Sequence, residues 1–508
     1  MKQSVVIIGG GVGGLFTGAF LAKNGLHVTV LEKNTIIGGG LQCFHRKGKI
    51  FETGMHVLGG FQPGGSLSKI CCYLGILDRL DLHHIPEGQM DEIRYGSNGD
   101  VYKIPSGREN FTAYFSGLFP EEAEGIRDYV NEIYRLTEEV PLFYVKEAPS
   151  GMTIHSERFT WAADRLIAHY VKNEHLREVL AYLNPLYGGI AGHTPAYIHA
   201  LINVLYINGA SRFVGGSQQL ADALREVVEE NGGQVIGNKE VVSVAVGADR
   251  RAESVTCSDG ETYTADWVVS AVHPTELLKM LPSGAFPKAF AQRLDEIPVS
   301  YSAFTLFVDL KPGMFPYIDH TCYFMEDYGA IWNQHETPEP EWPKGFMYMT
   351  PPDPEQGEYA NRLLVHCIMD RHVPDKWKDT TVGHRGPEYE AWKVANVEKI
   401  LAKLERLFPG FRDMTANVYA ASPLTIRDYY HTKEGAIFGY RKDCANMMLS
   451  QIPVYTKVRN LLLTGQNINL HGICGVPLTA INTSEAILGH NSLVNSINHA
   501  YEKIRKQT

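Results

Sequence analysis

The residues with the clearest chemical signal stand near the start of the chain, where three glycines follow an apolar strand. Gly9, Gly11 and Gly14 form the pattern G-x-G-x-x-G directly after the run VVII, with Val12 and Gly13 between them. In such a pattern the first glycine makes a tight turn, the second lets a pyrophosphate approach the backbone, and the third lets a helix pack closely on the strand. A helix that begins here also offers unpaired N–H groups to phosphates. The glycines therefore predict a dinucleotide site.

An acidic residue stands where such a site needs one. A helical pattern from Leu15 to Asn24 and a second apolar strand, Val28 to Leu31, lead to Glu32, and Lys33 follows it. A carboxylate at this position can accept a hydrogen bond from a ribose hydroxyl. Strand, helix, second strand and acid in this order favour nucleotide binding over a purely structural loop.

Two further glycine-containing segments favour FAD over NAD, which Glu32 alone does not distinguish. The turn that includes Gly39 and Gly40 lets backbone press against a long cofactor. Near the other end of the chain, Thr464, Gly465 and Gln466 follow an apolar strand; the next loop contains Gly475, and a helix is expected from about Leu478 to Leu488. That helix would present another N-terminus to the cofactor. A cofactor that touches both chain ends must be elongated, as FAD is.

The signals of the nucleotide-binding domain fall into three separate blocks. The middle block has a helical face, a following strand and a β-meander that includes Glu240 to Val246, where Val242 is expected to contact the cofactor. It contains no second G-x-G-x-x-G, which excludes the reductases that bind two dinucleotides. A buried-looking strand, Ala265 to Ala271, closes the block. We therefore assign residues 1–74, 206–285 and 421–508 to one FAD-binding domain.

The intervening segments, 75–205 and 286–420, are rich in aromatic residues and proline. This content suits a large apolar cavity, with ordinary core packing as the alternative. The helices and strands expected here are Glu121 to Glu139, Tyr389 to Leu407, Ser302 to Leu310 and Arg362 to Met369. The sequence thus predicts an α/β protein with a Rossmann-type FAD-binding domain and an inserted α+β substrate-binding domain.

Length and charge limit the classes of function. The 508 residues suffice for two domains, and a net charge of -10 argues against nucleic acid as a partner. The first strand begins by Ser4, so we expect no signal peptide, and no apolar stretch reaches the length of a membrane span. We expect a cytoplasmic protein of open oligomeric state, and the basic residues Lys503 to Lys506 leave peripheral contact with an anionic membrane open.

Cysteine and histidine spacing indicates no metal centre. The eight cysteines contain no C-x-x-C pair, and the twenty histidines contain no H-E-x-x-H. We predict no bound metal and a reducing compartment.

Together these motifs resemble the flavin-dependent family that includes phytoene desaturases, carotenoid isomerases and retinol saturases. The resemblance covers most of the chain, and beyond the opening motif it rests on Gly38 to Gly40, Phe51 to His56, Phe213 to Leu224, Val268 to Ala271, and His273 with Pro274. Similarity to retinol saturases in particular lies in Ser422 to Thr425, Gly435 to Gly439 and Leu463 to Gln466. The run Ile473 to Pro477 departs from the small residues of that group, which leaves the substrate open.

The resemblance implies an FAD domain of the amine-oxidase type and redox chemistry on a carbon–carbon double bond of a hydrophobic polyene or isoprenoid. A saturase or desaturase would exchange hydride through flavin N5, and an isomerase would borrow electrons reversibly. No strong acid–base constellation is visible. The catalytic candidates, each with a structural role as its alternative, are His56, Tyr187, His193 and His199. His471 and Cys474, in the C-terminal loop, are similarly ambiguous.

Two other functions stay open. A flavin amine oxidase of the same fold would want a tight aromatic pocket, whereas the aromatic residues here are widely spread. A flavin-free carrier of prenyl lipids, like the GDP-dissociation inhibitors of small GTPases, is disfavoured by the intact glycines and Glu32. Because one dinucleotide fingerprint serves the flavin, NAD(P)H would have to dock transiently as electron donor, or another donor must act.

Overall fold

The computed structural model describes residues 3–54, 57–149 and 154–506. Within them, a five-stranded parallel sheet has the order β10-β2-β1-β14-β20. Its strands are β1 (Ser4–Ile8), β2 (His27–Leu31), β10 (Gln234–Ile236), β14 (Trp267–Ser270) and β20 (Leu461–Leu463). They are short and almost entirely apolar because both faces of a parallel sheet are covered. The sheet joins the first, middle and last parts of the chain.

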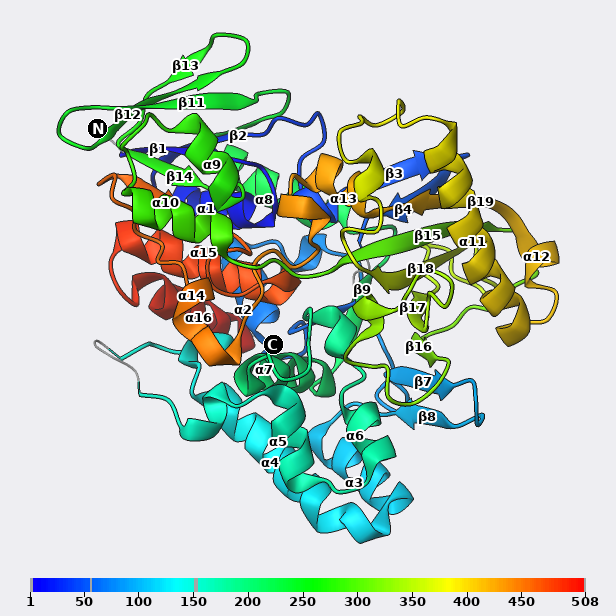
Figure 1. Cartoon of the computed structure of the whole chain (residues 1–508). Coiled ribbons are helices and arrows are strands. Elements are labelled where there is room, and N and C mark those ends of the chain that lie inside the picture. The colour runs from blue at the N-terminus through cyan, green and yellow to red at the C-terminus, as the bar shows by residue number, and fades with distance from the viewer. Residues whose placement is uncertain (1–2, 55–56, 150–153, 507–508) are drawn as a thin grey trace.

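Helices from distant parts of the chain pack beside this sheet. Its helices are α1 (Val12–Lys23), α8 (Gln218–Glu230) and α15 (Gly472–Leu488), and α1 contacts the other two. Figure 1 shows α15, in the red part of the colour scale, directly beside the blue α1. Apolar residues of α8 at helical spacing, such as Leu220, Leu224 and Val228, are buried. This packing brings both ends of the chain to one side of the sheet.

Smaller elements surround the parallel sheet. The antiparallel meander consists of β11 (Val241–Val246), β12 (Ala252–Cys257) and β13 (Thr262–Tyr263), which lie along the upper edge in Figure 1. The remaining helices of these parts of the chain are α2 (Ser66–Leu74), α9 (Pro274–Met280), α13 (Pro423–Tyr430), α14 (Met447–Ser450) and α16 (Ser492–Arg505). A hairpin pairs β3 (Cys43–Arg46) with β4 (Lys49–Glu52).

The second large sheet of the described residues has seven strands in the order β19-β15-β18-β17-β16-β7-β8. They are β7 (Asp91–Tyr95), β8 (Val101–Ile104), β15 (Ser302–Leu310), β16 (Thr321–Met325), β17 (Gly345–Met349), β18 (Arg362–Met369) and β19 (Thr415–Ala421). Alternate residues of β15 face opposite cores: Leu306 and Val308 join the core that includes Ile400 of α11 (Pro387–Leu407), and Phe307 joins the main core. The short helix α12 (Phe411–Met414) follows α11.

A helical region and a small sheet connect the two large sheets. The helices are α3 (Arg108–Leu118), α4 (Ala123–Glu138), α5 (Ala163–Tyr170), α6 (Glu174–Leu180) and α7 (Ala196–Ile207). Helix α10 (Lys288–Glu296) lies apart from them and packs beside α9, near the parallel sheet. Figure 1 shows α3 to α6 at the lower end of the molecule, with α7 between them and α15. The small sheet has the order β5-β9-β6, from β5 (Leu58–Gly59), β6 (Leu82–His84) and β9 (Ala210–Phe213).

The predicted fold class, an α/β protein of Rossmann type with an inserted α+β part, is confirmed. The helix expected from about Leu478 instead begins at Gly472 and contains Pro477 within it, and the helix expected from Glu121 begins with a short 3-10 turn. The domain boundaries stay a prediction. No helix of the described segments is both long and apolar enough to cross a bilayer.

Candidate functional site

The glycines of the first turn differ sharply in how much space surrounds them. A Cβ added at Gly14 would lie 1.9 Å from the carbonyl oxygen of Gly9, so only glycine lets α1 pack there. A Cβ at Gly11 would meet only the Cα of Gly39, at 4.0 Å. Gly11 caps α1 in extended conformation and without a side-chain hydrogen bond. The third glycine is therefore required by packing, and the second leaves open space at a helix N-terminus, as a pyrophosphate needs.

Glu32 lies at the end of β2, beside the first turn. Its side chain is buried, and its two oxygens accept hydrogen bonds from the amides of Gly10 and Asn34, each at 2.8 Å. The amide of Lys239 in turn donates to the Glu32 carbonyl at 2.8 Å, which ties the middle block to this point. A carboxylate oxygen with one backbone donor keeps a free lone pair for a ribose hydroxyl.

The glycine turn after β2 folds back onto the first turn. The amide of Gly38 donates to the carbonyl of Gly10 at 2.8 Å, and a Cβ at Gly39 would lie 3.2 Å from the Cα of Gly11. At Gly40 a Cβ would meet nothing within 4 Å. The two glycine turns therefore lie against each other, and we call the open backbone surface that they share at Gly11 and Gly40 the glycine groove.

The C-terminal loop reaches the same groove. A Cβ on Gly13 would lie 2.8 Å from the Cα of Gly465, and the hydroxyls of Thr17 and Thr464 lie 3.1 Å apart. Helix α15 then begins at Gly472, within a few residues. The groove thus carries two helix N-termini, those of α1 and α15, which suits an elongated cofactor with a phosphate part and a second polar part. The residues of this groove fit a bound dinucleotide.

The outer members of the predicted cofactor set lie at the periphery of the groove. The Nζ of Lys33 is 2.9 Å from the Nδ1 of His431 and 4.0 Å from a carboxylate oxygen of Glu240. Val242 lies on β11 with 47% of its surface exposed. Gln466 follows Gly465 directly, and Gly475 packs against Leu470. Their contacts to a cofactor stay predictions.

Two of the catalytic candidates come together, and a third does not join them. The hydroxyls of Tyr129 and Tyr187 lie 2.7 and 2.9 Å from the two ring nitrogens of His199, and the whole cluster is buried. Burial lowers the pKa of His199 to about 3 and raises that of Tyr187 well above its usual value. His193 is paired elsewhere, with its Nδ1 2.9 Å from Asp443. His56 lies outside the described residues.

One apolar cavity lies between α7 and α15. Its free volume is about 30 Å³, and the gaps between its lining atoms together with its open mouth bring the total to about 370 Å³. Its lining consists of Phe143, Ile198, Leu201, Ile202, Leu205, Leu470, His471, Cys474, Gly475 and Leu478. The Cys474 thiol donates to the carbonyl of Gly59 at 3.0 Å, and burial raises its pKa to about 12, so it stays protonated. Because its wall includes the start of α15, this cavity adjoins the C-terminal side of the groove.

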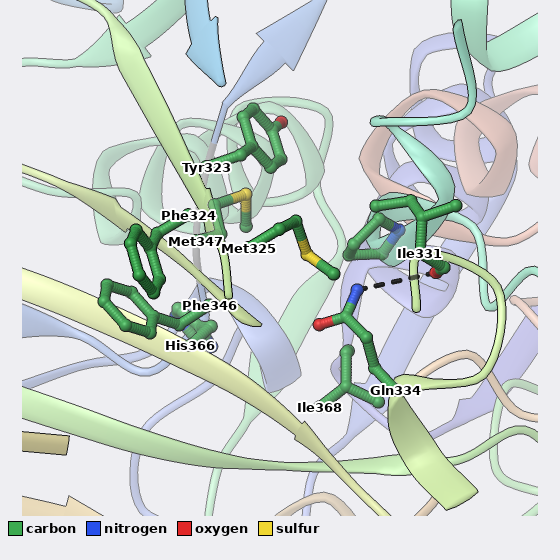
Figure 2. A pocket seen from close by; sticks show the side chains of 10 residues that line it. Tyr323, Phe324, Met325, Ile331, Gln334, Phe346, Met347, His366 and Ile368 are labelled. Carbon is green, nitrogen blue, oxygen red and sulfur yellow. Dashed lines mark hydrogen bonds between the residues drawn. The ribbon is translucent and has the colours of Figure 1, made fainter. Parts of the chain in front are cut away.

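A smaller cavity, with a free volume of about 10 Å³, lies at the seven-stranded sheet (Figure 2). Figure 2 shows Tyr323, Met325 and Met347 from β16 and β17 on one side, with Gln334 on the other. Gln334 donates to the carbonyl of Ile331 at 3.5 Å. This space holds at most about one water molecule, so the aromatic residues here mainly form core.

Two buried titratable residues, Asp91 and Lys442, are not predicted by the sequence. Asp91 is fully buried; burial raises its pKa to about 7, and Tyr182 donates to it at 2.7 Å. Lys442 is also buried, with its Nζ donating to the carbonyl of Ser450 at 2.8 Å, and burial lowers its pKa to about 7. Nothing in the local sequence marks these residues, because their burial comes from distant segments.

One group of potential metal ligands occurs in the described part of the chain. Ligand atoms of Glu92, His320 and Cys322 all lie within 4.8 Å of one another. Arg94 and Gln89 already donate to Glu92, at 2.5 and 3.3 Å, and burial raises the pKa of Cys322 to about 12. The prediction of no metal stays a prediction.

Comparison with solved structures supports the fold. An oxidoreductase from Methanosarcina mazei superimposes with a TM-score of 0.63 at 18% identity, covering 95% of this chain and 100% of that chain. Putrescine oxidase bound to putrescine gives a TM-score of 0.63 at 15% identity, covering 96% of this chain and 99% of that chain.

Sequence comparison extends over the same length. Human all-trans-retinol 13,14-reductase is 26% identical over 553 residues, which covers 100% of this chain and 88% of the human protein. Phytoene desaturase (lycopene-forming) of a Paracoccus species is 25% identical over 457 residues, covering 86% of this chain and 87% of that protein. The predicted resemblance is confirmed.

The family model described as flavin containing amine oxidoreductase matches residues 12–316, more than half of the chain. The match begins within the first glycine turn and includes Glu32, the turn with Gly39 and Gly40, the middle block and part of the seven-stranded sheet, whereas the C-terminal loop lies beyond it. With these relatives and this groove, the chain belongs to the flavin containing amine oxidoreductase family and is a flavin-dependent oxidoreductase.

Proposed function

We propose that this protein binds FAD in the glycine groove and acts on a carbon–carbon double bond of a hydrophobic polyene or isoprenoid. The observation that carries the proposal is the apolar cavity between α7 and α15, which opens beside the C-terminal end of the groove. Its walls match an apolar chain, and relatives named as a retinol reductase, a phytoene desaturase and a prolycopene isomerase align with 85–100% of this chain at 24–26% identity.

FAD is the flavin that the groove favours, because two helix N-termini and two glycine turns lie along it. The open space at Gly11 and Gly40 would admit the pyrophosphate, and Glu32 would hold the ribose. The start of α15 would direct its N–H groups toward the polar edge of the flavin ring. NAD(P)H, if it is the electron donor, would dock transiently.

When bound, the flavin supplies reversible hydride and electron transfer to or from carbon. The protein's own contribution is to orient an apolar chain and to exclude water. Ile198, Leu201 and Leu205 of α7 form one apolar wall, and Leu478 of α15 forms part of the other. The protonated Cys474 thiol, held by the Gly59 carbonyl, adds bulk without a charge.

An amine oxidase activity fits this cavity less well. An alkyl ammonium would call for an acidic side chain or an aromatic cage. The cavity lining, taken from the described residues, contains no Asp or Glu and no Trp or Tyr, and its aromatic side chains are Phe143 and His471. A flavin-free lipid carrier would have no use for the open space at Gly11. Both remain outcomes of the test.

The test begins with the colour of the purified protein, which should absorb near 450 nm as a property of the flavin. After anaerobic photoreduction, the protein is mixed with retinoids, carotenoids and amine-derived imines, and flavin reoxidation and product are followed. Reoxidation by polyenes, or polyene reduction, desaturation or isomerisation, would support the proposal. A colourless protein that FAD cannot reconstitute, or turnover of amines alone, would refute it.

A further inference from the structure

His471 is a buried imidazole that forms no hydrogen bond with any of the described residues. Only 7% of its surface is exposed, and among the described residues neither Nδ1 nor Nε2 has a partner. Buried polar groups in folded proteins are nearly always paired, and an unpaired one destabilises the fold. An unpaired imidazole of this kind therefore indicates a partner outside the described residues, such as a bound molecule.

His471 lies in the wall of the apolar cavity between α7 and α15. His471 lines that cavity together with Leu201, Leu205 and Cys474. It stands at the N-cap of α15 but makes no side-chain capping bond, so its nitrogens are not used by the helix. Its ring packs against Phe438, with ring centroids 5.2 Å apart, which fixes the ring from one side.

The charge state of His471 restricts the partner. Burial, with a smaller effect of the Lys442 ammonium, lowers the pKa of His471 to about 3, so the ring is neutral near pH 7. A neutral imidazole carries one donor and one acceptor. The described residues that line this cavity include no Asp, Glu, Lys or Arg, so nothing in its wall calls for an ionic ligand. A hydroxyl, which both donates and accepts, matches such a site.

We propose that His471 is the specificity-determining residue for the polar end of the substrate, and that this substrate is an apolar alcohol held by its hydroxyl on the imidazole. The inference rests on the proposed function, since it assumes that the cavity between α7 and α15 receives the substrate. The inference restricts the expected substrates to polyenes that carry a hydroxyl and disfavours pure hydrocarbons.

The test compares two ligands on the flavin-loaded full-length protein. The ligands are all-trans-retinol and the matching hydrocarbon, in which hydrogen replaces the hydroxyl, and tryptophan fluorescence quenching under anaerobic conditions gives Kd for each. Wild type should bind the alcohol about tenfold more tightly, the ratio expected for one net hydrogen bond at a buried site. His471→Phe keeps the ring shape and should abolish that preference by weakening alcohol binding alone.

Two further variants separate specificity from packing. His471→Gln, which retains a donor and an acceptor, should restore part of the preference for the alcohol. Leu201→Ala, on the opposite wall, should weaken both ligands by a similar factor and leave their ratio unchanged. The flavin content and the thermal unfolding midpoint of each variant show whether it remains folded and loaded.

The other outcomes are equally informative. Equal affinities of wild type for the two ligands, or an unchanged preference in His471→Phe, would overturn the inference and leave the proposed function standing. A loss of flavin in folded His471→Phe, with the preference retained, would assign the imidazole to the cofactor instead and also overturn it. A yellow wild-type protein that binds neither ligand would refute the proposed polyene function and the inference with it.

Discussion

The hydroxyls of Thr17 and Thr464 lie 3.1 Å apart in a buried contact, although 447 positions separate them in the chain. Thr17 belongs to α1, just after the first glycine turn, and Thr464 directly follows β20, the strand that precedes α15. Beside them, the backbone of Gly465 approaches Gly13 so closely that no side chain fits between. The contact therefore joins the two ends of the chain at the groove that we assign to the flavin.

This contact should be measurable as a coupling free energy. Thr17→Val and Thr464→Val each leave one buried hydroxyl unpaired and should lower the free energy of unfolding by about 1–2 kcal/mol. The double variant should lose less than the sum, with a coupling of about 1 kcal/mol. Urea unfolding of wild type, the two single variants and the double variant, all without added flavin, gives the free energies from which the coupling is calculated. Strictly additive losses would contradict a direct interaction.

The two glycines of the first turn should respond differently to valine. Gly11→Val places its side chain in space that the protein leaves open, so the chain should fold but lose flavin. Gly14→Val brings a Cβ against the Gly9 carbonyl and should destabilise the fold by about 3 kcal/mol or more. The ratio of flavin to protein after gel filtration and the thermal unfolding midpoint distinguish the two effects. Full flavin occupancy in Gly11→Val would show that the pyrophosphate binds elsewhere.

His199 should make the protein sensitive to acid. Burial lowers its pKa from 6.5 to about 3, so between these values the folded protein binds fewer protons than the unfolded chain. Its contribution to stability is therefore complete above about pH 6.5 and is lost as the pH falls toward 3, at up to about 1.4 kcal/mol per pH unit.

The variant His199→Asn removes this titration. It should lower stability at pH 7, because Tyr129 or Tyr187 loses its partner, and should flatten the loss of stability on acidification. Urea unfolding at several pH values between 4 and 7 measures how the free energy of unfolding changes with pH in wild type and in the variant. The same slope in wild type and variant would mean that His199 is not a buried neutral group.

Cysteine labelling should single out Cys444. Of the eight cysteines, all within the described residues, Cys444 is half-buried and the other seven are buried. Burial also raises the pKa of Cys474 to about 12, which keeps its thiolate population negligible at pH 8. Iodoacetamide on the native protein, followed by mass spectrometry, should modify Cys444 first and spare Cys474. Rapid labelling of Cys474 would indicate an accessible thiol beside the cavity.

The local sequence is sufficient to predict the strand, the glycine turn and the helix at the start of the nucleotide-binding region. The roles of Gly9, Gly11, Gly14 and Glu32 follow from fixed spacing within one strand–helix–strand unit, where neighbours in sequence are neighbours in space. The strand expected at Ser302 to Leu310 is also present, since its β-branched and aromatic residues favour extended chain. The sequence predicts that the last glycine-flanked helix begins at about Leu478, but α15 begins at Gly472. The prediction is late because Gly472, Gly475 and Pro477 usually indicate a loop.

The surroundings of the catalytic candidates could not be predicted from the local sequence, because distant segments determine them. His193 and His199 are close in sequence, yet one pairs with Asp443 and the other lies between two buried tyrosines. The isolation of His471 and the burial of Lys442 and Asp91 likewise depend on segments far away in the chain.

The sequence by itself determined that the chain has a single G-x-G-x-x-G turn between a strand and a helix, and that its family is flavin-dependent. Only the tertiary structure decided that both ends of the chain share one groove and that α7 and α15 enclose an apolar cavity with an unpaired imidazole in its wall. The reason is physical: hydrogen bonding and steric fit within a turn act over a few residues, whereas burial, pKa and cavity shape are set by whichever distant segments pack together.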